Sequence, residues 1–224
     1  MEPDYRDNDG LETPARSNRF EITGGFLSRG GYPMRSWLDV VRDMPKQAPP
    51  DIMVIMMNPG ASGPSPTTTA DPGRCGIAQR QQLARPDRTQ LQIIRLLNAV
   101  GLNHARILNL SDFRTSHSRD LVRFLVSEEA AMIDHSIFSP SRRGELESLL
   151  VRDIPTVYAW GVHPSLLPLA QRAVDALGIS AAMGIPKTGT PYAYYHPLPP
   201  VYARQLAWVR KVAAQYTNLA RLLD

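Results

Sequence analysis

The chain has 224 residues, of which 43% are hydrophobic and 21% charged, a balance typical of a globular protein with a buried core. No apolar run reaches the roughly 18 residues of a membrane span, and the single cysteine, Cys75, excludes an internal disulfide and an iron–sulfur cluster held by four cysteines of this chain. The net charge of +4 and the pI near 9.4 are compatible with nucleic acid but do not select it.

The N-terminal part of the chain is polar up to residue 18 and predicts a loosely attached tail. Because this tail has no apolar signal core, we expect a cytoplasmic protein. Residues 19–23 are compatible with a short strand before a Gly-Gly break. Apolar residues at helical spacing, such as Trp37 and Val40, then predict a short amphipathic helix over residues 36–44.

Residues 52–57 form an unbroken apolar run, IMVIMM, which suits a parallel strand buried on both faces. Asn58, Pro59 and Gly60 break this strand at its carboxyl end, where open α/β sheets bind ligands. Asn58 offers an acceptor and two donors there, and Gly60 permits close backbone approach or a positive φ. The alternative interpretation is an ordinary turn from strand to loop.

The remaining elements alternate along the chain. We expect helices over residues 89–100, 118–133, 142–151, 163–177 and 203–223, and strands over residues 105–110, 155–161 and 192–195. This order predicts an α/β fold with three α/β/α layers and a central, mostly parallel four-stranded sheet. We expect residues 19–224 to form one domain and the protein to be a monomer.

A long loop rich in Gly, Pro, Ser and Thr, residues 61–76, follows the first core strand. Loops of this length in compact domains are usually functional or disordered. Arginines lie in it or just past it, at positions 74, 80, 85 and 88. They predict either a patch that contacts phosphates or a solvated surface without a partner.

Polar side chains follow the ends of several predicted strands, namely Asn58, Asn109, Asp112, Arg114 and His196. This architecture favours one site assembled from several strand ends. The sequence has no Gly-rich dinucleotide fingerprint and no phosphate-binding P-loop. Its other histidines do not cluster with Cys75 or with carboxylates at metal-ligand spacing, so we predict no metal and no cofactor.

Two motifs resemble the active-site motifs of the uracil-DNA glycosylase superfamily, and most closely its mismatch-specific uracil/thymine and single-strand-selective branches. MMNPG at residues 56–60 resembles the first motif, Gly-x-Asn-Pro-Gly, with Met56 in place of the leading glycine. HPLPPVY at residues 196–202 resembles the second motif, His-Pro-Ser-Pro-Leu-Ser, with Leu198 and Pro200 in place of a serine and a leucine.

Two further segments extend the resemblance over residues 50–205. VYAWG at residues 157–161 resembles the apolar strand that precedes the second motif, and ILNLSDFR at residues 107–114 resembles the strand ending in an asparagine that reads the base edge. The same pattern also resembles a family of small uncharacterised bacterial proteins that have an Asn-Pro motif after a strand.

The resemblance implies a monofunctional DNA glycosylase, which flips a base out of DNA and hydrolyses its N-glycosidic bond to leave an abasic site. Asn58 would position the attacking water, and His196 would donate to the carbonyl oxygen of the departing base. Either Asp112 or Asp71 would supply a carboxylate base. No lysine lies in the motifs to form a Schiff base, so lyase chemistry is not expected.

The base-edge reader implied by the resemblance is Asn109, through its amide. Arg114 is either a phosphate anchor or an ion-pair partner. The aromatic side chain that stacks on the base stays open among Phe113 and the tyrosines at 194, 195 and 202, because Ala61 and Ser62 occupy the usual place. We expect base contacts at Met57, Pro59, Gly60, Asn109, Phe113 and Tyr195, and DNA contacts at Arg74, Arg80, Arg114, Pro199 and Tyr202.

The substrate base stays open at this point. Uracil or mismatched thymine is the family default, and the altered motifs leave room for a modified cytosine, for which removal from phage DNA would be a defence. The alternatives are a non-catalytic nucleic-acid-binding module on the same fold and a hydrolase of free nucleosides or nucleotides.

Overall fold

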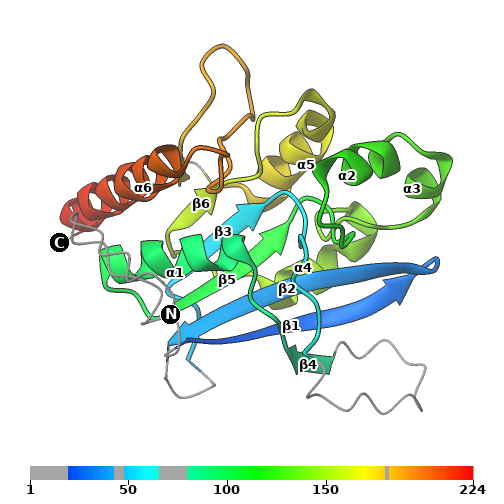
Figure 1. Cartoon of the computed structure of the whole chain (residues 1–224), viewed down its shortest axis with the longest axis horizontal. Coiled ribbons are helices and arrows are strands. Elements are labelled where there is room, and N and C mark those ends of the chain that lie inside the picture. The colour runs from blue at the N-terminus through cyan, green and yellow to red at the C-terminus, as the bar shows by residue number, and fades with distance from the viewer. Residues whose placement is uncertain (1–19, 43–47, 66–79, 180–181, 224) are drawn as a thin grey trace, which may run out of the picture.

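The computed structural model describes residues 20–42, 48–65, 80–179 and 182–223. Within them, seven strands form one mixed sheet in the order β4-β1-β2-β5-β3-β6-β7 (Figure 1). The strands are β1 (Phe20–Arg29), β2 (Tyr32–Arg42), β3 (Ile52–Met56), β4 (Arg80–Leu83), β5 (His104–Asn109), β6 (Thr156–Tyr158) and β7 (Met183–Gly184). Strands β5, β3, β6 and β7 run parallel, whereas β1, β2 and β4 are antiparallel and join the parallel part through the β2–β5 pair.

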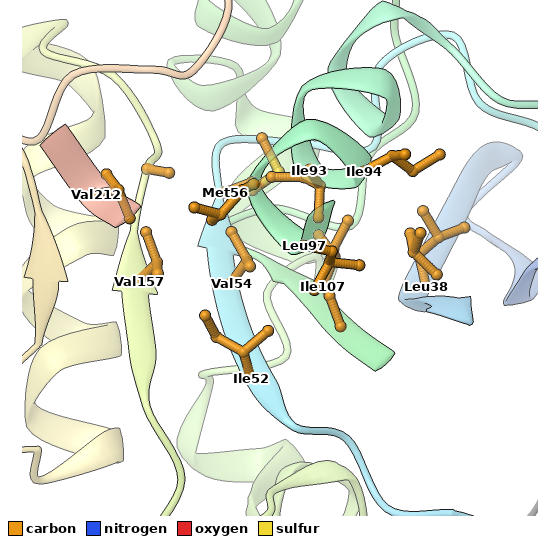
Figure 2. Packing of buried hydrophobic residues seen from close by; sticks show 14 of the residues in the cluster. Leu38, Ile52, Val54, Met56, Ile93, Ile94, Leu97, Ile107, Val157 and Val212 are labelled. Atoms are coloured by element: carbon orange, nitrogen blue, oxygen red, sulfur yellow. The ribbon is translucent and has the colours of Figure 1, made fainter. Parts of the chain in front are cut away.

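Helices cover both faces of this sheet, which confirms the α/β class. They are α1 (Arg88–Val100), α2 (Ser118–Leu125), α3 (Glu128–Met132), α4 (Arg143–Leu149), α5 (Leu167–Leu177) and α6 (Tyr202–Leu223), with short 3₁₀ turns η2 (Pro140–Arg142) and η3 (Pro164–Leu166). One buried cluster joins β3, β5 and β6 to α1 and α6, as Figure 2 shows for Val54, Ile93 and Val212. A second cluster, on the opposite face, includes residues of α2, α4 and α5.

The predicted four-stranded sheet was wrong on the N-terminal side, where a long antiparallel hairpin replaces the predicted helix over residues 36–44. The helical spacing of its apolar residues arises because β2 is covered on both faces: Leu38 packs in one cluster and Trp37 against the other. The two-residue turn at Gly30 and Gly31 has positive φ at both positions, 55° and 81°, as a tight hairpin requires. Residues 43–44 and the predicted tail lie outside the described residues.

The predicted strand over residues 192–195 was also wrong. Tyr194 makes only isolated bridges, to Gly161 and Pro186, and Tyr192 has a positive φ of 59°, which interrupts an extended strand. The last parallel strand is instead the two-residue β7. Its outer side is met by the Gln215 side chain of α6, which accepts from the Gly184 N–H at 2.8 Å and donates to the Gly184 carbonyl at 2.9 Å.

The helix predicted over residues 118–133 is two helices, because the chain leaves α2 after Leu125 and restarts at Ser127. The Ser127 hydroxyl accepts from the Ala130 N–H at 3.3 Å and so caps α3. The other predicted helices occur with ends shifted by a few residues. Gly101 follows α1 in the left-handed conformation expected for a helix-ending glycine, with a φ of 73°.

Replacing Gly184 by alanine should destabilise the fold by about 2–4 kcal/mol. Gly184 has a φ of 138°, and a Cβ there would lie 2.5 Å from the Tyr158 carbonyl oxygen and 2.9 Å from a ring carbon of Tyr194. Urea unfolding would measure the loss. Gly144→Ala in α4 is the matched control, since its Cβ meets nothing within 4 Å and should stabilise the helix by about 0.5–1 kcal/mol. Equal effects of the two substitutions would contradict this packing at β7.

Candidate active site

The site lies where β3 and β5 end side by side. The ladder between them continues past both strands, because the Leu110 N–H donates to the Met56 carbonyl at 2.8 Å and the Ser111 N–H to the Met57 carbonyl at 3.1 Å. β3 also lies between β5 and β6. The strand order therefore reverses at β3, since β5 pairs with one edge of β3 and the later strand β6 pairs with the other. The carboxyl edge at such a switch point is where open α/β sheets bind ligands.

Asn58 is held in one orientation by the chain that follows β5. Its Nδ2 donates to the carbonyl oxygens of Thr115 at 2.9 Å and Phe113 at 3.4 Å. Since both partners are acceptors, they fix which end of the amide is nitrogen. The Oδ1 atom is therefore left as an acceptor, an arrangement that can hold a water molecule.

Asn109, the last residue of β5, is fully buried, and neither its Oδ1 nor its Nδ2 has a hydrogen-bond partner among the described residues. Buried amides in folded proteins are usually paired, so an amide with both ends unpaired needs a physical reason. Asn109 pairs with Met56 of β3, and Met56 precedes Asn58 by two residues. The Asn109 amide therefore lies beside the chain that leads into the Asn58 turn. An acceptor and a donor side by side match the edge of a nucleobase.

His196 lies in the loop before α6 and is half-buried. The Leu198 N–H donates to its Nδ1 at 3.1 Å, so Nδ1 carries the lone pair and the proton of the neutral ring is on Nε2. Burial lowers the pKa of His196 to about 4, and the negative charge of Asp87 opposes this fall. At neutral pH the ring is therefore an uncharged donor through Nε2.

Asp87 lies against the loop after β3 and acts electrostatically on His196, and sequence reasoning missed it. Its Oδ1 accepts from the Thr89 N–H at 2.7 Å and the Gln90 N–H at 3.3 Å, while the Gln90 side chain accepts from the Asp87 N–H. Its other oxygen, Oδ2, lies 2.8 Å from where a Cβ on Gly60 would be. The signal was present, because an Asp-x-x-Gln pair before a helix is a capping box.

Arg114 lies along the same loop. Its Nε donates to the Ser62 carbonyl at 3.1 Å, a side chain at Gly63 would overlap its guanidinium, and it stands 5.5 Å from the ring centre of Phe26. Burial lowers its pKa. It makes no ion pair within the described residues, so of the two predicted roles the phosphate anchor is the one still open.

Arg35 is a second cation that sequence reasoning missed, because it lies in the segment predicted as a helix. The β1–β2 register shifts between Gly25 and Phe26, which leaves Ser36 as an extra residue and pairs Arg35 with Phe26. The Arg35 side chain is fully buried, and its Nε and Nη1 have no hydrogen-bond partner among the described residues. Burial lowers its pKa to about 10, with Asp87 opposing and Arg114 adding to the effect.

Asp112, one of the two predicted carboxylate bases, points to the start of α4. Its Oδ2 accepts from Arg142 Nη1 at 2.5 Å, and Arg142 also donates twice to Glu145 at 2.8 Å. Burial raises the pKa of Asp112 to about 7, against the pull of Arg142. Its Oδ1 is unpaired within the described residues. Asp71, the other predicted base, lies outside the described residues.

The remaining predicted base contacts divide between core and surface. Phe113 packs against two aromatic rings: its ring centre lies 4.4 Å from that of Phe124 and 5.4 Å from that of Tyr32. Met57 packs at the edge of the second cluster and Pro59 is buried, whereas the Tyr195 side chain is exposed. The structure therefore brings Asn58, Gly60, Asn109, Arg114 and His196 to one edge, and directs Phe113 and Tyr195 elsewhere.

Two of the predicted DNA contacts, Pro199 and Tyr202, lie in the loop before α6 and at the start of that helix. The Pro199 carbonyl accepts from Gln205 at 2.7 Å, and Gln205 in turn accepts from Gln92, which ties the HPLPP loop to α6 and α1. Tyr202 begins α6, is exposed and lies under the Arg95 guanidinium. Arg80 belongs to β4, and only its backbone is among the described parts of the chain. Arg74 lies outside the described residues.

Comparison of the chain with family models, curated proteins and solved structures gives no match. Across the described part of the chain, no group of three or more His, Cys, Asp or Glu side chains is arranged to hold a metal ion. None of the helices described here is both long and apolar enough to cross a bilayer.

We expect the His196 ring to titrate near pH 4 in the folded protein, which an NMR titration of the imidazole signals would measure. The unfolded ring, with a pKa of 6.5, binds a proton between pH 6.5 and 4 while the folded ring does not. The contribution of His196 to the free energy of unfolding should therefore decrease as pH falls through this window. His196→Gln should remove the low-pH signal and His163→Gln should retain it. A His196 midpoint near 6.5 would contradict a ring that its surroundings keep neutral.

Proposed function

We propose that the protein is a monofunctional DNA glycosylase. The observation that carries this proposal is the buried amide of Asn109, whose donor and acceptor both lack partners within the described residues and which lies beside the Asn58 loop. An unpaired amide of this kind suits the edge of a flipped base, which would satisfy both of its ends. The sequence motifs around Asn58 and His196 support the same reaction class.

The reaction breaks the bond between the sugar C1′ and the base nitrogen, and forms a bond from C1′ to a water oxygen. Positive charge develops on the sugar and negative charge on the base, and a water proton ends on the base. Asn58 would accept a hydrogen bond from the water through Oδ1, since Nδ2 is held by two backbone carbonyls. His196 would donate from Nε2 to the carbonyl oxygen of the departing base.

A neutral imidazole is suited to this last role. With a pKa of about 4 the ring is neutral at pH 7, and the N–H of a neutral imidazole is a very weak acid. His196 therefore stabilises the departing base by hydrogen bonding from Nε2 and does not transfer the proton. The predicted carboxylate base, Asp112, is engaged by Arg142 through Oδ2. We assign Asp112 to the reaction only through its unpaired Oδ1.

The substrate proposed here is uracil, mismatched thymine or a modified cytosine in DNA, the last of these in phage DNA. A hydrolase of free nucleotides is the second candidate, and the observation that favours it is the pair of arginines, Arg35 and Arg114, near the same loop. A terminal phosphate of a nucleotide would suit such cations. DNA binding without excision would identify the third possibility, a nucleic-acid-binding module.

Replacing Asn58 or His196 by alanine should each slow base excision by about 100- to 1,000-fold, the loss seen when one such hydrogen-bonding group is removed from an active site. The assay would use DNA with uracil, with mismatched thymine, and phage genomes with modified cytosine, followed by alkali cleavage at abasic sites.

The chain offers matched controls for both substitutions. Asn218→Ala removes an exposed asparagine of α6. His163→Ala removes an exposed histidine whose Nδ1 also accepts from a backbone N–H two residues on, so it tests the local geometry without the burial. Wild-type excision rates in both Asn58→Ala and His196→Ala would show that these residues do not carry the reaction.

Asn109→Leu should leave the free energy of unfolding unchanged or raised by up to about 1 kcal/mol, because the amide has no hydrogen bond to lose and the shapes are similar. The same substitution should strongly reduce excision. Gln92→Leu is the control for stability, since it removes the donor to buried Gln205 and should destabilise by about 1–3 kcal/mol. Equal destabilisation by both, measured in urea, would make Asn109 a structural residue.

A further inference from the structure

The described residues contain two buried arginines, Arg35 and Arg142, and they differ in how far their hydrogen-bond donors are paired. Arg142 donates to Asp112 and Glu145 at 2.5–2.8 Å, so its charge is compensated. Arg35 is 1% exposed, and neither its Nε nor its Nη1 has a hydrogen-bond partner among the described residues. A buried guanidinium with two of its three nitrogens unpaired is strongly unfavourable unless something binds it.

The charges around Arg35 do not compensate it. Asp87 acts on it electrostatically, yet forms no ion pair with it, and Asp87 Oδ1 already caps α1. Asp112 also acts on it, yet its carboxylate is taken by Arg142. The nearby Arg114 adds a second positive charge. Arg35 therefore has no carboxylate paired with it and a second cation near it, which leaves an excess of positive charge.

Two further unpaired polar groups lie in the chain segments that carry Arg35 and that contact Arg114. The hydroxyls of Ser36 and Ser62 are buried without partners among the described residues. Ser36 adjoins Arg35 in the bulge, and the Ser62 carbonyl accepts from Arg114. Phe26 connects the two arginines, since it pairs with Arg35 across the hairpin and packs against Arg114. Guanidinium and hydroxyl donors in this combination suit an oxyanion.

We propose that Arg35 and Arg114, with the hydroxyls of Ser36 and Ser62, bind an oxyanion of the phosphate class beside the Asn58 loop. The group comes either from a phosphodiester of a DNA strand or from the terminal phosphate of a free nucleotide. Binding of this anion compensates the Arg35 charge, and the β2 bulge is the feature that directs Arg35 to it. The site does not depend on base excision, so it stands or fails separately from the proposed glycosylase.

The first test is thermal unfolding in inorganic phosphate, against sodium chloride at the same ionic strength. A ligand that binds only the folded state raises the Tm by an amount that grows with the logarithm of one plus the ratio of ligand concentration to Kd, so the wild-type Tm should rise in phosphate only. Arg35→Met should weaken the apparent phosphate affinity by about 10- to 100-fold, and Arg114→Met should weaken it less. Arg123→Met, which removes an exposed charge of α2, should leave it unchanged. An equal phosphate response in wild type and Arg35→Met would overturn the proposal.

The second test is the stability of Arg35→Met without phosphate. Because this substitution removes an uncompensated buried charge and keeps most of the side-chain volume, it should raise the Tm by about 2–8 °C. Arg142→Met is the contrast, since it leaves Asp112 buried without its partner and should lower the Tm. An Arg35→Met protein that is less stable, or that fails to fold, would make Arg35 structural and overturn the proposal.

The source of the anion is identified by three probes in the same unfolding assay: deoxyuridine monophosphate, deoxyuridine, and an oligonucleotide without a terminal phosphate. A response to the monophosphate that exceeds the response to deoxyuridine, and that is lost in Arg35→Met, identifies a nucleotide. A response to the oligonucleotide that is lost in the same variant identifies a phosphodiester. Either result supports the anion site whether or not excision is observed, and equal responses of wild type and Arg35→Met to all three probes would overturn it.

Discussion

The pairing of β3 with β5 is the constraint on which the rest of this site depends. Because the hydrogen-bonded ladder runs past the ends of both strands, the loops that follow them stay in register. Asn58 is therefore held by carbonyls of the chain after β5, and Asn109 lies beside the chain that enters the Asn58 turn. A one-residue shift of this pairing would turn the side chains of one strand to the opposite face and separate the two amides.

Sequence reasoning predicted β3 and β5 correctly, because their apolar runs are buried on both faces. Such runs are typical of parallel strands inside a covered sheet. It failed for β2, where a strand covered on both faces mimics helical spacing at Trp37 and Val40. It failed for β7 because a two-residue strand has no periodicity to detect. In both places the partner strand, and not the local sequence, decides the conformation.

Asn58 and Asn109 were predictable because they stand at the ends of β3 and β5. His196 was singled out through its HPLPP segment and through a predicted strand over residues 192–195 that does not form. Arg35 has no such signal, since its direction is set by a bulge that depends on pairing with β1. Asp87 carried a capping signal, but that signal concerns the start of α1 and says nothing of His196. Both residues reach the site through tertiary contacts alone.

The side chain of Gln215 has a consequence for association between copies of the chain. A sheet that ends in an uncovered strand offers its backbone groups to strands of other molecules. Here one amide occupies the N–H and the carbonyl of Gly184, as a neighbouring strand would, and it belongs to the long helix α6. The outer edge can thus consist of two residues and still be closed to intermolecular strand pairing at Gly184, so the terminal helix protects the chain from aggregation at this point.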